Sequence, residues 1–280
     1  MVFRLALLIL LCAPVVVTGA ADDSLNRCLV CHPVHHASLG SCVDCHRGDP
    51  RSSRPNIAHF GLIQARYAWF NLPDSTRVED GARQLDTYAC RRCHVVDQRG
   101  NQLASNLDQS VALSAPLPLV EAIRQPVIFM PDFHLPDTLL DRLINALYAA
   151  GRRAIIPAGE KPQVVHFEGQ TGAADNLFVK HCGSCHRVLT AAQGGLGSSD
   201  VAPNLSGLLT PHYPATAADN TAWTRENLQK WLKNPRDIHP LTRMMPVPME
   251  EEELARLLDL LDEEISLSPP APLPAASSAF

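Results

Sequence analysis

The residues of this chain whose types and spacing most clearly indicate chemistry are four copies of the pattern Cys-x-x-Cys-His. The two thiols of such a pattern lie about one helical turn apart, so each can form a thioether with one edge of a single macrocycle, and the following imidazole can bind the iron. This is the spacing of covalent c-type haem attachment. The cysteines are Cys28, Cys31, Cys42, Cys45, Cys90, Cys93, Cys182 and Cys185, and the histidines are His32, His46, His94 and His186. We therefore predict four covalently bound haem c groups.

Other chemistry of paired cysteines explains less of the pattern. The first two pairs are ten residues apart, which also suits a zinc ribbon. A disulfide framework is an alternative in an exported protein, and a thioredoxin-like pair would need a βαβ context. None of these needs a histidine after every pair. The motifs use eight of the nine cysteines, and the ninth, Cys12, lies in a segment that we expect to be removed.

The first residues predict export. Residues 1–20 have the pattern of a secretory signal peptide, with Arg4 followed by an apolar run from Leu5 to Val17. This run is short for a membrane span, which needs about 20 apolar residues. We expect cleavage near Ala20 and a location in the periplasm or at the outer cell surface; an uncleaved anchor is the alternative.

The composition of the chain limits the fold classes and the functions that it can have. A net charge of −5 gives no basic footprint for nucleic acid. Aromatic residues are only 5% of the chain, and a macrocycle is a large apolar body around which few side chains are needed. We predict a mostly α fold in which short helices and long loops wrap around covalently bound haems. The segment 267–280 is rich in Pro, Ala and Ser and predicts a disordered tail.

The segment 22–72 is predicted to hold two haems, because it carries two motifs within nineteen residues. So short a segment cannot build its own hydrophobic core, so we expect two closely packed haems to form it. His35, His36 and His59 are the candidates for further axial ligands. A histidine three or four residues past a proximal histidine cannot reach the far face of the same haem, so His35 or His36 would serve the neighbouring one. We predict His36 and His59 as ligands. Arginines that suit haem propionates are Arg47, Arg51 and Arg54.

The segment 76–155 is predicted to be a module with one haem. A helix over 81–94 runs into the third motif. Thirty-six residues after His94 comes Met130, whose soft thioether suits haem iron opposite an imidazole. We predict Met130 as the sixth ligand, with His134 as its competitor. Asp137 is expected to cap a helix that ends near Gly151 and packs on the motif helix. The apolar stripe of this helix is Leu139, Leu140, Leu143, Ile144 and Leu147.

The segment 166–266 contains an ordered series of features: a predicted helix over 173–186, then Ala202-Pro203-Asn204-Leu205, then residues 228–235, then Met244-Met245-Pro246 and a final helix. In this order of features the segment resembles a class I cytochrome c domain. The resemblance implies that residues 202–205 shield the proximal histidine. It also implies that Met245 is the axial ligand, with Met244 and Met249 as alternatives. The final helix should cross the helix that contains Leu177 and Phe178, and the module 76–155 matches the same pattern more loosely. The expected apolar stripe of the final helix is Leu254, Leu257, Leu258, Leu261 and Ile265.

The whole chain resembles multihaem c-type cytochromes of bacterial extracellular electron transfer, including those of selenite or tellurite reduction operons. The stretches that carry this likeness are residues 28–62, the third motif and residues 100–104. The resemblance implies an electron carrier whose partners are other cytochromes or membrane quinol-oxidising complexes, with a membrane-associated conduit as one setting. The alternative is a multihaem oxidoreductase that reduces a small oxyanion or peroxide at an open iron, beside basic groups such as Arg91 and Arg92.

Overall fold

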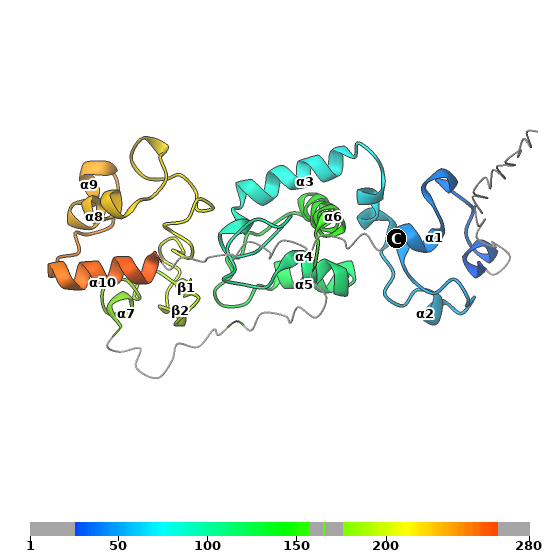
Figure 1. Cartoon of the computed structure of the whole chain (residues 1–280), viewed down its shortest axis with the longest axis horizontal. Helices are drawn as coiled ribbons and strands as arrows, with labels where there is room; N and C mark the ends of the chain where they lie inside the picture. The colour runs from blue at the N-terminus through cyan, green and yellow to red at the C-terminus, as the bar shows by residue number, and fades with distance from the viewer. Residues whose placement is uncertain (1–25, 157–164, 166–175, 263–280) are drawn as a thin grey trace, which may run out of the picture.

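A computed structural model describes residues 26–156, 165 and 176–262. Within these ranges the chain is mostly helical, with one two-stranded sheet, so the predicted helical class is confirmed. Three groups of helices follow one another along the longest axis of Figure 1. None of the helices in the described part is long and apolar enough to cross a membrane. The predicted signal peptide and tail lie outside the described residues.

The first group carries two motifs on very short elements. No residue from 26 to 62 is buried. Helix α1 coincides with the second motif and begins after Ser41, whose backbone N–H donates to the Asp44 carboxylate at 2.7 Å. The elements are η2 (Arg27–Val30), η3 (Ala37–Leu39), α1 (Cys42–His46) and α2 (Pro55–Ala58). This segment therefore has no hydrophobic core of its own side chains, as we predicted.

Two 3₁₀ turns join the first group to the second, η4 (Ala65–Tyr67) and η5 (Trp69–Asn71). The hydrophobic cluster of the second group buries Ile63, just before these turns, Tyr67 in η4 and Ala68 between the two turns. The packing boundary between the two groups therefore lies before Ile63.

The second group is built around two packed helices, α3 (Thr76–Thr87) and α6 (Asp137–Arg153). They approach so closely that a Cβ on Gly81 would lie 2.0 Å from the carbonyl oxygen of Arg142. This packing and a buried stripe on α6 were predicted, although Leu139 is only partly buried. The other elements are η6 (Cys90–Arg92), α4 (Leu107–Leu113) and α5 (Pro116–Arg124).

Two predictions about these helix ends were wrong. The helix over 81–94 begins earlier, at Thr76, and ends at Thr87, because Ala89 adopts a left-handed conformation with φ of 50°. A left-handed residue cannot continue a right-handed helix, so the third motif lies on a separate 3₁₀ turn. Asp137 is the first residue of α6, and Pro136 occupies the capping position.

The third group has terminal helices that pack on each other, as predicted. Phe178 and Leu257 are fully buried in one cluster, and Lys180 pairs with Glu253 at 3.0 Å. The helices are α7 (Leu177–His181), α8 (Arg225–Lys233), α9 (Pro235–Ile238) and α10 (Glu251–Leu261), with the turn η8 (Ala218–Asn220). In the described part, α7 ends at His181, before the motif, and not at 186 as predicted. Ile265 lies outside the described residues.

A β-hairpin follows the fourth motif and was not predicted. Strand β1 (Val188–Thr190) pairs antiparallel with β2 (Gly194–Leu196), so that Val188 lies opposite Leu196. All six of its residues are buried.

Candidate haem sites

Three motif histidines are held in the same way. The Nδ1 atom of His46 lies 2.9 Å from the carbonyl oxygen of Ile63, that of His94 lies 2.8 Å from Ser105 O, and that of His186 lies 2.7 Å from Pro203 O. A carbonyl oxygen only accepts, so Nδ1 donates and the lone pair is on Nε2. Histidines that bind metals are oriented by such a bond to their other nitrogen. In all three imidazoles the Nε2 lone pair is thus left available to a metal.

The first site has its motif histidine beside a second histidine. The ring centroids of His32 and His59 are 6.1 Å apart, with an angle of 50° between the ring planes. Imidazole–metal bonds are about 2 Å long, so this separation suits one ion between two ring nitrogens. The structure thus places the predicted ligand His59 against the first motif.

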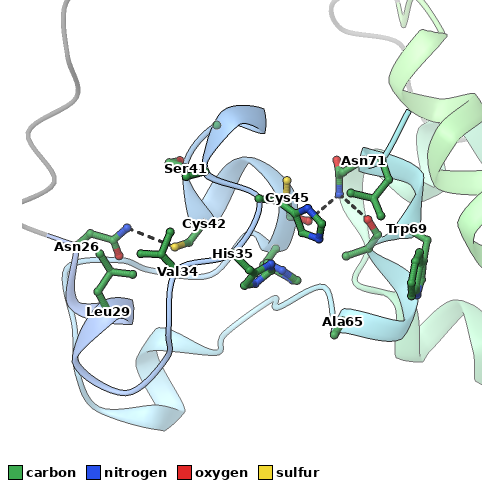
Figure 2. Close-up of a pocket in the computed structure, with 16 residues that line it drawn as sticks. Asn26, Leu29, Val34, His35, Ser41, Cys42, Cys45, Ala65, Trp69 and Asn71 are labelled. Atoms are coloured by element: carbon green, nitrogen blue, oxygen red, sulfur yellow. Dashed lines mark hydrogen bonds between the residues drawn. The ribbon is translucent and has the colours of Figure 1, made fainter. Parts of the chain in front are cut away.

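The second site lies in a cavity of about 260 Å³. Figure 2 shows His35, Cys42 and Cys45 around it. The ring of His46 lies 5.6 Å from that of His35. We predicted His36 as the ligand, but the structure places His35 against the motif histidine. His36 lines the same cavity and has a left-handed backbone with φ of 51°, and its ring lies at 82° to that of His35. The ring that lies against His46 is that of His35, so His35 is the better candidate.

Two asparagines brace the second motif, and sequence analysis missed both. The Asn26 side chain donates to Cys42 Sγ at 3.5 Å and accepts from Cys28 N at 3.2 Å, so it links the first two motifs (Figure 2). The Asn71 side chain donates to Cys45 O at 3.1 Å. An asparagine close to a motif is too common to have been a signal in the sequence.

The third site lies in a larger cavity of about 470 Å³, lined by Cys90, Cys93, His94 and Met130. Cofactor cavities are typically about 300–1,000 Å³ and mostly apolar, and most of the other residues that line this one are apolar. Burial lowers the pKa of His94, which favours the neutral imidazole that binds metals. His134, the predicted competitor, has an exposed side chain paired with Asp132, so the structure favours Met130.

The fourth site carries Cys182, which is buried, and Cys185, which is exposed. Pro203, in the segment predicted to shield the histidine, supplies the carbonyl that holds His186. Met244 packs in the hydrophobic cluster of the third group, and its sulfur lies 2.9 Å from Trp231 Nε1. Met245 is 65% exposed. The Met245 sulfur also accepts, from Arg236 Nη2 at 3.9 Å, so these contacts do not choose between the two methionines, and Met245 stays the predicted ligand.

The third and fourth sites share one backbone plan. Leu107 N donates to Val95 O at 2.9 Å, and Leu205 N donates to Arg187 O at 2.8 Å. In both, a glycine with positive φ passes the motif histidine so closely that a Cβ would lie about 2 Å from the histidine carbonyl: 2.0 Å for Gly100 and 2.1 Å for Gly197. The sequence signal for this plan is the Asn-Leu pair at 106–107 and at 204–205, which we did not connect.

No family model and no solved structure matches this chain. Its chemistry must therefore be read from its own donor groups. All eight described cysteines are free thiols. In the described ranges, no three His, Cys, Asp or Glu side chains converge on one point as around a bound metal ion. What each motif presents is a thiol pair beside one imidazole, which is the donor set for a covalent haem and its proximal ligand.

Two of the three arginines predicted for propionates, Arg47 and Arg51, have other partners. Arg47 donates to Ser114 O and to Val111 O, both at 2.9 Å, and its guanidinium lies over the Tyr148 ring. A cation at the carbonyl end of α4 also complements the helix dipole. Arg51 pairs with Asp49. Arg47 therefore docks the first group on the second.

Proposed function

We propose that this protein is an exported tetrahaem c-type cytochrome that relays electrons between redox partners. The observation that carries the proposal is the set of three motif histidines, each held by a downstream carbonyl so that Nε2 carries the lone pair. The His35 ring lies beside His46, and Met130 shares a cavity with His94. When bound, haem iron supplies reversible one-electron chemistry. The chain would supply the thioether links, two axial ligands at each site and apolar walls.

The ligand types order the sites by potential. Two imidazoles serve each of the first two sites in this proposal, and a thioether would face His94 and His186. Methionine opposite histidine raises the reduction potential. Electrons would therefore run downhill from the first group of helices to the third. The partners are other cytochromes or membrane quinol-oxidising complexes, met in the periplasm or at the outer surface.

Reduction of an oxyanion or peroxide is the competing function, and it needs an iron with an open sixth position. The chain has a histidine or methionine as a candidate for that position at each site, namely His59, His35, Met130 and Met245. A redox titration followed by absorbance should resolve a low-potential pair and a higher-potential pair, and the reduced protein should not bind carbon monoxide at neutral pH. Stoichiometric carbon monoxide binding, or four indistinguishable potentials, would overturn the relay.

A further inference from the structure

Asn204 lies where the second and third groups of helices meet, and it forms hydrogen bonds with residues of both groups. Its side-chain Nδ2 donates to Phe129 O at 3.0 Å in the second group. Its Oδ1 accepts from Ser206 N at 2.9 Å and from Ser206 Oγ at 2.6 Å in its own loop. Its main-chain carbonyl accepts from Arg92 Nη1 at 3.2 Å and from Tyr213 OH at 3.0 Å. One residue therefore fixes a loop of each group.

The neighbours of these contacts are the axial ligands of two sites. Phe129 directly precedes Met130, the candidate ligand of the third site. Pro203 directly precedes Asn204, and its carbonyl holds His186 of the fourth site at 2.7 Å. Arg92 is part of the third motif and lines the third cavity. A chain of covalent and hydrogen bonds thus runs from Met130 through Asn204 to His186.

The junction around Asn204 is partly buried, and a small apolar cluster lies beside it. A small hydrophobic cluster of Leu103, Phe129 and Leu189 brings the two groups together, and each of these side chains is at most 5% exposed. Arg187, the residue after the fourth motif, donates to Ile128 O at 3.1 Å beside them. Hydrogen bonds in such surroundings are stronger than in water and costly to leave unmade. Because of the Asn204 contacts, the loop before Met130 and the loop that holds His186 should move together.

We propose that Asn204 is the positioning residue that couples the third and fourth sites. It fixes the carbonyl before Met130 and the carbonyl that orients His186, so a change of geometry at one site is transmitted to the other. This inference rests on the proposed function, because it treats both residues as haem ligands. Coupling of this kind is reciprocal: a change at either site must affect the other equally in free energy.

The substitution Asn204→Asp isolates the cross-group contact. A carboxylate keeps the acceptor that Ser206 uses, but it places an oxygen in front of Phe129 O where the amide had donated. The matched control is Asn106→Asp. Asn106 occupies the equivalent place after the third motif, and its side chain accepts from Asp108 N and Gln109 N at the start of α4. Aspartate caps a helix about as well as asparagine.

Two readouts on the purified holoprotein test the coupling. One is hydrogen exchange at the Met130 amide, which donates to Val127 O at 2.8 Å. The other is the near-infrared absorption of methionine-ligated ferric haem, read at the third site in a Met245→Leu background. Asn204→Asp should speed Met130 exchange about tenfold, the effect of losing one buried hydrogen bond, and should weaken the absorption. Asn106→Asp should change neither.

Unchanged exchange and absorption in Asn204→Asp would overturn the coupling. If that variant does not fold, Arg92→Lys is the second test, because lysine keeps the charge but does not reach Asn204 O. This variant should shift the reduction potential of the fourth site. An unshifted potential would also overturn the coupling. A haem count separates this failure from failure of the proposed function. A protein without haem would refute the cytochrome, whereas the Met130 exchange rate would still report on the contact.

Discussion

Asn145 is the residue whose replacement gives the best-defined change in stability. It is fully buried on α6, its Oδ1 accepts from Phe70 N at 3.1 Å, and its Nδ2 donates to Arg66 O at 2.9 Å. Asn145→Leu keeps the volume and leaves both backbone groups without this partner. A backbone group left without its partner costs about 1–3 kcal/mol when buried and less where water can reach it, and Arg66 is exposed, so the free energy of unfolding should fall by about 1–3 kcal/mol. That is a sizeable part of the roughly 5–15 kcal/mol that stabilises a typical protein.

The loss should be largest in the segment that Asn145 holds. Residues 63–71 include Ile63, whose carbonyl orients His46, so hydrogen exchange of this segment should accelerate and the spectrum of the second site should change with it. Urea unfolding followed by circular dichroism gives the global value. Thr138→Ala, on the exposed start of the same helix, should shift it by less than about 0.5 kcal/mol. A loss in Asn145→Leu no larger than in this control would refute the hydrogen-bond account.

Three further predictions concern the first two groups of helices. Arg47→Gln should free the first group from the second, which small-angle scattering would report as an increased radius of gyration; an unchanged radius would contradict the docking role. His35→Ala should open the second site to carbon monoxide, whereas His36→Ala should not, and the opposite result would restore the ligand first predicted. Burial raises the pKa of Tyr148 to about 12, above the usual value of about 10, so the folded state keeps a proton that the unfolded state loses. Stability should therefore fall between about pH 10 and 12. Burial also raises the pKa of Tyr67 and of Tyr213, so Tyr148→Phe should make the fall in urea titrations shallower, and a fall as steep as in the unsubstituted protein would contradict the assignment.

Local patterns in the sequence predicted several helices near the third and fourth motifs, although the ends of the helices that precede these two motifs were placed wrongly. The stripe from Leu140 to Leu147 predicted the buried face of α6, and the run from Leu228 to Pro235 coincides closely with α8 and the start of α9. These features depend on neighbours three or four residues apart, which a sequence displays directly. Motif histidines were equally evident, because their spacing to the cysteines is fixed by chemistry.

Long-range contacts decided what could not be predicted. The bond from Arg47 to Ser114 O spans 67 residues, and that from Asn204 to Phe129 O spans 75. No local pattern marks either pair. The choice between His35 and His36 depended on which ring lies against His46, a contact that the sequence does not display. The hairpin β1–β2 was missed because three-residue strands are too short to show an alternating pattern.

The central claim is that the four motifs carry covalent haem, and the mass of the purified exported protein under denaturing conditions tests it most directly. The account predicts a mass that exceeds the polypeptide by four haem groups, and a red protein whose haem stays attached in acid and organic solvent. A colourless protein of polypeptide mass alone, with zinc or cystines accounting for the eight sulfurs, would contradict it.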